Sequence, residues 1–524
     1  MHPAERTANF PNHPSKGGLA SGLGAAAVIS AASLAVHWFF NNRYGYFRDE
    51  FDYLACGQHL AWGYVDQPPL VPFLTQLSRF TLGESLRAIR FLPALAVSAV
   101  ILLAAMIARE LGGRRFAIAL TALCVAVAPI YLSDGSLLTT NSYEPLIWMA
   151  CAWFGIAAVK RNQPRNWLWF GIAAGIGLEE KYTIAVFGLG VVIGLLLTEQ
   201  RKVLLNRWMW LGGLAAFLIF LPNLIWNIQN QWPFAQLMHN IRVSGRDVAL
   251  TPVQFFSQQI LLLSPLAAPV WIIGAGALLL AKRMKPYRWL GWSFLVSFAV
   301  IAGLHGKNYY LAPIYPMLFA AGAVGMESAI DRPGWRWGKP AILALVFVGG
   351  ALLAPVTMPV LPVEQVQTYL QRMHIEVPKS EKSHERARLP QTYADQFGWL
   401  ELVEKVAEVW DRIPAAERQD CGIFAQDYGQ AGALDFFGPR YHLPPALSGH
   451  QTYFLWGPHG YSGNCLIVLD ERKAVLEQLF ERVEFMGVSS DNPYALEREI
   501  PVFLVHKIKS GTLSQLWPQI KRWR

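Results

Sequence analysis

Over its first two thirds, the chain alternates long apolar runs with short polar segments. A run of about 17–25 apolar residues is long enough to cross the hydrocarbon core of a bilayer as a helix. The pair of runs at 167–178 and 182–198 also fits one long broken span, because Glu179, Glu180 and Lys181 interrupt it. Taking that pair as two spans, the pattern predicts eleven, at 18–40, 89–108, 116–132, 143–159, 167–178, 182–198, 208–226, 255–281, 289–304, 309–326 and 341–360.

After about residue 360 the sequence turns polar, and short strand and helix patterns alternate. A glycine-rich turn, DYGQAGAL, opens one of the helices, and alternation of this kind is typical of a small α/β domain. We therefore predict a polytopic α-helical membrane domain at 1–360 and a soluble C-terminal α/β domain at 361–524. The tail pattern predicts helices near 397–413 and 472–482, and strands at 422–425, 466–469 and 502–507.

Composition supports the membrane interpretation. Hydrophobic residues make up 53% of the chain and charged residues only 15%, whereas soluble proteins carry about 25% charged residues. The composition of the first two thirds of the chain therefore excludes a soluble, a disordered and a fibrous protein. The net charge of +9 comes from basic residues clustered between apolar runs, with no basic stripe interleaved with aromatic residues, so we exclude nucleic acid as a partner.

The distribution of basic residues predicts the orientation of the chain. Lys and Arg are concentrated in the N-terminal segment and in every second loop after it. Because basic loops stay in the cytoplasm, the N-terminus is expected inside and, after eleven spans, the C-terminal domain outside. The first apolar run is too long, and lacks the small-residue cleavage site, for a cleaved signal peptide.

The first outside segment, 41–88, contains the sequence YFRDEFDYLACGQHLAWGYVDQPPL. Phe51, Leu54, Ala55 and Trp62 fall on one helical face, which predicts a helix lying in the membrane interface. The paired prolines of DQPPL are expected to stop it, because proline lacks a backbone donor and restricts the preceding residue.

Charged residues gather on the outside face, and charge beside spans is costly and usually functional. A reaction that releases a lipid phosphate needs such a face, with a carboxylate to take a proton and Lys or Arg to hold the phosphate. Structural interpretations stay open for each residue: a solvated turn for Arg48–Glu50, a snorkelling Lys181, a helix-start carboxylate for Glu144.

Five cysteines are present. Cys124 and Cys151 lie inside apolar runs and fit small core residues, and Cys56 lies in the first outside segment. Cys421 and Cys465 each start a predicted strand, and if the tail is outside, a disulfide between them is one of the open alternatives. The sequence has no CxxC or HExxH motif, which argues against a cysteine or zincin metal site.

The chain resembles the family 39-type membrane glycosyltransferases of the GT-C superfamily, which include protein O-mannosyltransferases and the lipid A aminoarabinose transferase. The most specific signal is the first-loop sequence above followed by RFLPAL, and GKNYYLAPIYP and the tail sequence YADQFGWLELV also fit. The resemblance implies a GT-C helix bundle with interface helices in the first loop. It covers most of the chain and is strongest for the bacterial members.

The resemblance also nominates site residues. It implies that Asp49 is the catalytic base, with Glu50 beside it, and that Glu144 is the acidic residue before proline in the second external loop. Some members have Lys where this chain has Gln67, which weakens phosphate binding at that position. Together with the charge pattern, it gives Asp49, Glu50 and Glu144 as catalytic candidates and Arg48, Gln67, Arg90, Lys181, His305, Lys307 and Tyr310 as candidates for binding the donor phosphate.

By the same resemblance, the donor is a polyprenyl-phosphate sugar and the reaction an inverting displacement at the outer face of a bacterial inner membrane. The acceptor is an envelope glycolipid or lipopolysaccharide-type glycan, with a protein less favoured. Some relatives bind a divalent metal ion and others work without one, so a metal cofactor stays open. The runner-up functions are a lipid or glycolipid flippase, disfavoured because no internal repeat is visible, and a non-catalytic assembly protein.

Overall fold

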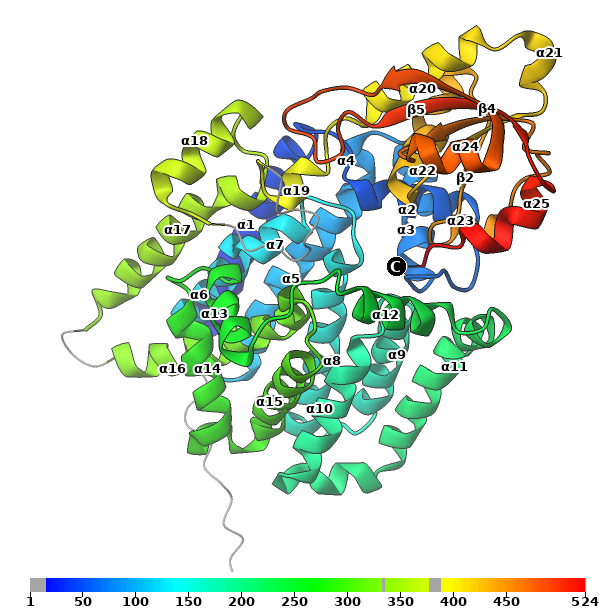
Figure 1. Ribbon diagram of the computed structural model, residues 1–524. Coiled ribbons are helices and arrows are strands. Elements are labelled where there is room, and N and C mark those ends of the chain that lie inside the picture. Colours follow the sequence, from blue (N-terminus) through cyan, green and yellow to red (C-terminus); the bar gives the residue numbers. More distant parts are fainter. Residues whose placement is uncertain (1–15, 332–334, 377–387, 524) are drawn as a thin grey trace, which may run out of the picture.

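The computed structural model describes residues 16–331, 335–376 and 388–523. Figure 1 shows a helix bundle with a smaller mixed region of helices and strands against one end of it. We refer to residues 388–523 as the C-terminal region. The first-loop helices α2 (Arg48–Gln58), α3 (Leu70–Leu82) and α4 (Leu86–Ile89) lie between the bundle and this region.

Each predicted apolar run is largely helical in the structure. The buried residues of the bundle form one continuous apolar core. Its helices are α1 (Lys16–Phe40), α5 (Phe91–Glu110), α6 (Arg115–Val127), α7 (Pro129–Asp134), α8 (Glu144–Lys160), α9 (Asn166–Leu178), α10 (Ile184–Leu196), α11 (Arg207–Gln229), α12 (Pro233–Ser244), α13 (Pro252–Leu262), α14 (Ala268–Leu280), α15 (Arg288–Gly303), α16 (Tyr315–Ile330) and α17 (Gly338–Thr357).

Six helices in the described residues are long and apolar enough to span a membrane, or seven if the bent pair 184–205 counts as one span. Shorter apolar helices accompany them at Arg115–Val127, Asn166–Leu178 and Ala268–Leu280. The chain is therefore a multi-pass helical membrane protein, as the sequence predicts. The count of eleven spans stays a prediction.

Two predicted spans are not single helices. The run at 255–281 is divided into α13 and α14, so its prediction as one helix was wrong: the chain turns at Ser264, whose φ is 71°, and at Pro265, which cannot continue a helix. The run at 116–132 is interrupted at Ala128, because Pro129 starts the separate helix α7. Apolar composition alone does not reveal these breaks, since both halves remain apolar.

The C-terminal region is built on a five-stranded sheet of order β2-β1-β3-β5-β4. The strands β1 (Cys421–Ala425), β3 (Cys465–Leu469) and β5 (Pro501–Ile508) and the helix α20 (Trp399–Arg412) confirm the sequence predictions, whereas β2 (Ala446–Ser448) and β4 (Phe480–Val488) were not predicted. Strand β1 pairs in parallel with β2 and β3, and β5 is antiparallel to β3 and β4. The predicted helix 472–482 ends at Leu479 as α24 (Lys473–Leu479), because Phe480 begins β4.

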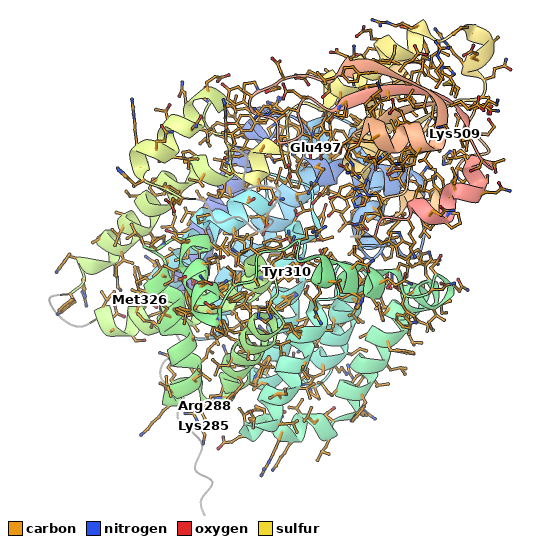
Figure 2. The ribbon with its side chains drawn as sticks, in the orientation of Figure 1. Lys285, Arg288, Tyr310, Met326, Glu497 and Lys509 are labelled. Atoms are coloured by element: carbon orange, nitrogen blue, oxygen red, sulfur yellow. A yellow bond between two sulfur atoms is a disulfide. The ribbon has the colours of Figure 1, made fainter. Side chains whose placement is uncertain are left out.

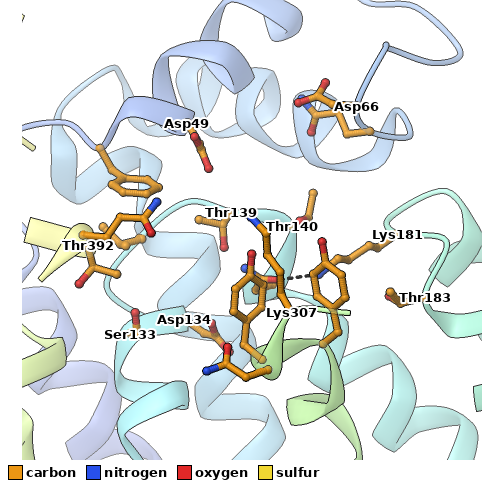
Figure 3. Close-up of a pocket in the computed structure, with 18 of the residues that line it drawn as sticks. Asp49, Asp66, Ser133, Asp134, Thr139, Thr140, Lys181, Thr183, Lys307 and Thr392 are labelled. Atoms are coloured by element: carbon orange, nitrogen blue, oxygen red, sulfur yellow. Dashed lines mark hydrogen bonds between the residues drawn. The ribbon is translucent and has the colours of Figure 1, made fainter. Parts of the chain in front are cut away.

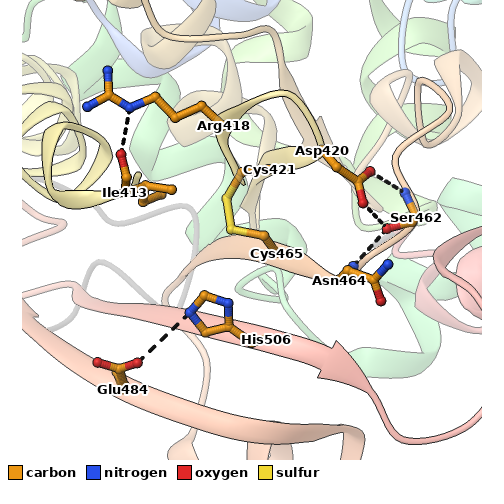
Figure 4. Close-up of a disulfide and its surroundings, with 9 residues drawn as sticks. All are labelled: Ile413, Arg418, Asp420, Cys421, Ser462, Asn464, Cys465, Glu484 and His506. Carbon is orange, nitrogen blue, oxygen red and sulfur yellow. Dashed lines mark hydrogen bonds and ion pairs between the residues drawn. A yellow bond between two sulfur atoms is a disulfide. The ribbon is translucent and has the colours of Figure 1, made fainter. Parts of the chain in front are cut away.

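A disulfide joins the two inner parallel strands. Cys421 and Cys465 are direct partners in the β1–β3 register, and their sulfur atoms are bonded. Figure 4 shows Asp420 beside this bond accepting hydrogen bonds from Ser462, which ties the loop before β3 to β1. The alternative of a disulfide, left open by the sequence, is therefore realised.

The apolar face of α2 packs against the C-terminal region. Phe51, Leu54 and Ala55 are buried in a core shared with the C-terminal region, where Phe51 packs against Trp399. The helix ends at Gln58, so Trp62 lies beyond it. The sequence predicts that a membrane surface covers this apolar face, whereas in the structure the C-terminal region covers it. An apolar stripe reports burial and not which partner covers it.

The neighbouring helix α3 instead carries the exposed apolar stripe of the first loop. Its side chains Phe73, Leu77 and Phe80 are 52%, 43% and 88% exposed. These positions follow helical spacing and form one outward face. This face, and not that of α2, has the character of a helix lying at a membrane surface.

Basic residues lie at the end of the bundle that is far from the C-terminal region. Figure 2 shows Lys285 and Arg288 at the end of the bundle far from the C-terminal region, whereas Glu497 and Lys509 belong to that region. Tyr310 lies between the two ends, near the middle of the molecule.

Candidate active site

A cavity of about 580 Å³ opens between the helix bundle and the C-terminal region. Figure 3 shows residues from both sides of it, with Asp49 on the first-loop side and Lys181 and Lys307 on the bundle side. Helix α12 closes it with apolar side chains, among them Leu237 and Ile241. Its ionisable and polar lining includes Arg48, Asp49, Tyr53, Asp66, Gln67, Asp134, Asn141, Lys181, Thr183, Arg246, Lys307, Tyr310, Thr392, Tyr428 and Gln451.

Asp49 lies in the first turn of α2, where a carboxylate favours helix formation. Its side chain is 34% exposed and lines the cavity. The hydroxyl of Tyr428 donates a hydrogen bond of 2.6 Å to its Oδ1 atom, and the Nε atom of Arg48 lies 3.7 Å from the same oxygen. Asp49 is thus held in place by the C-terminal region and still reaches the cavity.

Two further first-loop carboxylates, Asp52 and Asp66, lie close to Asp49. Burial raises the pKa of Asp52 well above its usual value, and the charges of Asp66 and Asp49 add to this effect. Burial likewise raises the pKa of Asp66 to about 7, and its Oδ1 atom lacks a hydrogen-bond partner among the described residues. Next to Asp49, the first loop therefore holds two carboxyl groups, Asp52 and Asp66, that burial makes more basic.

Gln67 lines the cavity but its amide is engaged. Its Nε2 atom donates a hydrogen bond of 2.8 Å to Oδ2 of Asp52. The residue thus orients a buried carboxyl group from beneath the cavity. This contact gives a structural reason for an amide at the position where the resemblance implies Lys.

Glu50 and Arg90 form a separate, buried cluster outside the cavity lining. Arg90 Nε and Nη2 lie 2.7 and 2.8 Å from the two carboxylate oxygens of Glu50, and both side chains are inaccessible to solvent. Glu50 also accepts hydrogen bonds from the backbone N–H groups of Phe47 and Leu138. A bidentate pair with this many partners has the arrangement of a structural ion pair, and the geometry favours that role over catalysis or phosphate binding.

Lys181 and Glu144 meet at the bundle side of the cavity. The Nζ atom of Lys181 lies 2.5 Å from Oδ1 of Asn141 and 3.1 Å from Oε2 of Glu144. The Thr183 hydroxyl donates a hydrogen bond to the other carboxylate oxygen of Glu144. Lys181 lines the cavity, whereas Glu144 is buried behind it. Burial acts to lower the pKa of Lys181, but Glu144 and the neighbouring tyrosines outweigh it and the net shift is upward, so Lys181 is a cation at neutral pH.

The late external loop brings two of its three candidates to the cavity. Lys307 lies 3.8 Å from Oδ1 of Asp247 and lines the cavity. The Tyr310 ring centroid lies 4.6 Å from Nζ of Lys181, within cation–π range. His305 is exposed and is not among the lining residues, so the structure separates it from the other candidates.

Several lining residues were not among the site candidates drawn from the sequence. Tyr428 lies in the glycine-rich turn of the tail, and Asn141, Thr183 and Arg246 lie in connections between helices of the bundle. None of them has a local pattern that distinguishes it from a surface residue. The one usable signal is that Tyr428 directly precedes the glycines that let its helix approach α2.

The described residues contain one convergent group of three potential metal ligands, Glu417, Cys465 and His506. It lies in the C-terminal region, and Cys465 is already bonded to Cys421 in the disulfide. Because a cysteine binds a metal only as a free thiolate, this group does not fit a metal site while the disulfide is formed.

Comparison with known proteins identifies one family model, one relative and solved structures that are similar to this chain. The family model "Dolichyl-phosphate-mannose-protein mannosyltransferase" matches residues 66–226. The lipopolysaccharide core galacturonosyltransferase RgtB of Rhizobium johnstonii is 24% identical over 302 residues. That alignment covers 57% of this chain and 58% of RgtB, so the chain spans less than two thirds of this relative.

Two crystal structures of ArnT from Cupriavidus metallidurans share the fold. The structure bound to undecaprenyl phosphate gives a TM-score of 0.60 at 16% identity, and the apo structure gives 0.63 at 14%. Each comparison covers 92% of this chain and 98% of ArnT. The similarity therefore extends through both the bundle and the C-terminal region, and a transporter is not favoured. The family model, the relative and the fold all agree with the resemblance to GT-C membrane glycosyltransferases that the sequence carries.

Proposed function

We propose that this protein transfers a sugar from a polyprenyl-phosphate carrier to an acceptor outside the cytoplasm. The observation that supports this most directly is the cavity, which has a carboxylate, Asp49, on one side and a lysine, Lys181, on the other. Sugar transfer from a lipid phosphate needs a base for the acceptor and a cation for the leaving phosphate. The solved relative with the same fold binds undecaprenyl phosphate.

In the proposed reaction, Asp49 accepts the proton of the acceptor hydroxyl. The acceptor oxygen forms a bond to the anomeric carbon while the bond from that carbon to the phosphate oxygen breaks, and the electron pair leaves with the polyprenyl phosphate. A single displacement of this kind inverts the anomeric configuration. We assign to Lys181 and Lys307 the role of stabilising the negative charge on the departing phosphate.

The arrangement in the membrane belongs to the same proposal. We assign residues 1–360, with eleven spans, to the membrane domain and 361–524 to a soluble domain in the periplasm of a bacterium. The basic residues at the far end of the bundle support this orientation, because they would face the cytoplasm. The cavity then opens on the side where nucleotide sugars are absent and a lipid-linked donor is required.

The proposed acceptor is an envelope glycolipid or lipopolysaccharide-type glycan. The printed name of RgtB, a lipopolysaccharide core galacturonosyltransferase, supports this class over a protein acceptor.

Mass spectrometry of envelope glycolipids tests the proposal. Cells that lack the gene are complemented with the wild type, with Asp49→Asn, or with Asp411→Asn. Asp411 is the control, because its side chain on α20 is 77% exposed and does not line the cavity. We expect one defined sugar to be present with the wild type and the control, and absent with Asp49→Asn while the lipid-linked sugar accumulates. Identical glycolipids and glycoproteins with and without the wild-type gene would overturn the proposal.

A further inference from the structure

One side chain of the C-terminal region reaches the proposed base in the cavity. Tyr428 is the first residue of α22 (Tyr428–Phe437), and its hydroxyl lies 2.6 Å from Oδ1 of Asp49. The two residues are 379 positions apart in the sequence. Tyr428 is thus the point at which a remote part of the chain reaches the proposed base.

The Tyr428 ring is held on two faces. It stacks on the His450 imidazole with ring centroids 5.1 Å apart and an interplanar angle of 5°, and the Arg48 guanidinium lies 5.7 Å from its centroid. The backbone N–H of Tyr428 also donates to Nδ1 of His450 at 3.2 Å. These contacts fix the direction of the phenol before any substrate binds.

The glycine-rich turn makes this placement possible. A Cβ atom at position 429 would lie 2.5 Å from Cγ of Arg48, and one at position 432 would lie 2.7 Å from Cβ of Phe51. Glycine at both positions lets α22 pack directly on α2. Asp427 caps α22 by accepting from the N–H groups of Gly429 and Gln430 at 2.7 and 2.9 Å, which fixes where the helix starts.

We propose that Tyr428 is a positioning residue for the transfer reaction: it holds the Asp49 carboxylate in its reactive orientation and favours its charged form. This inference rests on the proposed function. It assigns the C-terminal region a direct part in the reaction, because the Tyr428 hydroxyl of that region donates a hydrogen bond to the proposed base. Tyr428 acts through Asp49 and takes no proton itself.

The phenol is suited to remain a donor. Burial raises the pKa of Tyr428 well above its usual value; Arg48 acts against this shift and Asp49 adds to it. A protonated phenol beside a carboxylate forms a charge-assisted hydrogen bond, and such a bond favours the ionised carboxylate. The titratable groups that face Asp49 include Arg48, Asp52, Tyr53, Asp66 and Tyr428.

Tyr428→Phe tests the inference, because it removes only the hydroxyl and keeps the stacked ring. The matched control is Tyr453→Phe, which removes a phenol that donates to Asp435 at 2.7 Å in the same region but does not line the cavity. Transfer is assayed from pH 5 to 9, with membranes of the deletion strain as the source of donor and acceptor.

We expect Tyr428→Phe to lower kcat about 10- to 100-fold with KM little changed, which matches the loss of one hydrogen bond to a charged group. The acidic limb of its pH profile should move up by about one pH unit, because the charged form of Asp49 loses a donor. His450→Leu, which keeps the hydroxyl but removes the ring partner, should give a smaller shift in the same direction. An unchanged pH profile for Tyr428→Phe would overturn the inference.

A second measurement does not depend on activity. A water-soluble carbodiimide with glycine ethyl ester labels protonated carboxyl groups, and peptide mass spectrometry reports the labelling of Asp49 at each pH. In purified protein, Tyr428→Phe should extend this labelling to higher pH, whereas Tyr453→Phe should not. A shifted label in a protein that transfers no sugar would refute the proposed function alone. Active protein with an unshifted label would refute the role of Tyr428 alone.

Discussion

Asp49 and Glu50 are adjacent carboxylates on the first turn of α2, and the structure gives them opposite surroundings. Glu50 is completely buried and bonded to Arg90 and to two backbone N–H groups. Asp49 is one third exposed, contacts Tyr428 and lines the cavity. One position along a helix therefore separates a group that holds the fold together from a group that is available for chemistry.

The difference extends to the neighbouring residues. Around Glu50 every carboxylate oxygen has a partner, so burial of the ion pair is compensated. Around Asp49, the carboxyl groups of Asp52 and Asp66 are buried with too little compensation, and burial raises the pKa of both. Groups that are poorly compensated in the folded state are a feature of functional sites. Three variants test this contrast.

The largest effect is expected from Arg90→Met. It leaves the Glu50 carboxylate buried without its cation, and breaking a buried pair in this way costs about 3–5 kcal/mol. Thermal unfolding in detergent should show a large loss of stability, whereas Arg412→Met, which removes an exposed ion pair with Glu408, should leave unfolding almost unchanged. If Arg90→Met were as stable as the wild type, the ion pair of Glu50 and Arg90 would not stabilise the fold, and the contrast between Glu50 and Asp49 would be wrong.

Lys181→Met is expected to have the next largest effect. If Lys181 binds the donor phosphate, the KM for the donor should rise about 10- to 100-fold, the range for hydrogen bonds to charged groups. The double variant Lys181→Met/Glu144→Gln separates this role from pairing with Glu144. A donor KM that stays raised in the double variant supports phosphate binding, whereas recovery to the wild-type value would place Lys181 with Arg90 as a structural partner.

Asp66→Asn is expected to act in the opposite direction and to stabilise the fold. Burial raises the pKa of Asp66 to about 7, so between about pH 4 and pH 7 the folded state binds a proton that the unfolded state has lost. Stability from this group is therefore lost as pH rises through that window. The midpoint temperature of thermal unfolding of Asp66→Asn should be higher than that of the wild type at pH 8 and equal to it at pH 4. A variant less stable than the wild type at pH 8 would contradict the contrast with Glu50.

Much of the fold follows from local sequence patterns. Apolar runs predict the bundle helices because a bilayer requires each span to satisfy its own backbone hydrogen bonds, and strand and helix patterns predict β1, β3, β5 and α20 in the tail. The edge strand β4 and the short β2 escape prediction, because sheet pairing supplies most of their stability and depends on distant residues. The break at Ser264 also escapes prediction, because it lies inside a continuous apolar run.

The sequence by itself determined the class of fold: the apolar runs and the alternating tail pattern predict a multi-pass helical membrane protein with an α/β tail. Its RDEFDYL and QPPL segments carry the resemblance to GT-C membrane glycosyltransferases. Only the tertiary structure decided which side chains share the cavity. Helical periodicity places Phe51 on a buried face but does not say that the C-terminal region covers it. Asp49, Lys181 and Tyr428 come together through packing between segments hundreds of residues apart, and that packing depends on the shape of whole surfaces, which no local pattern records.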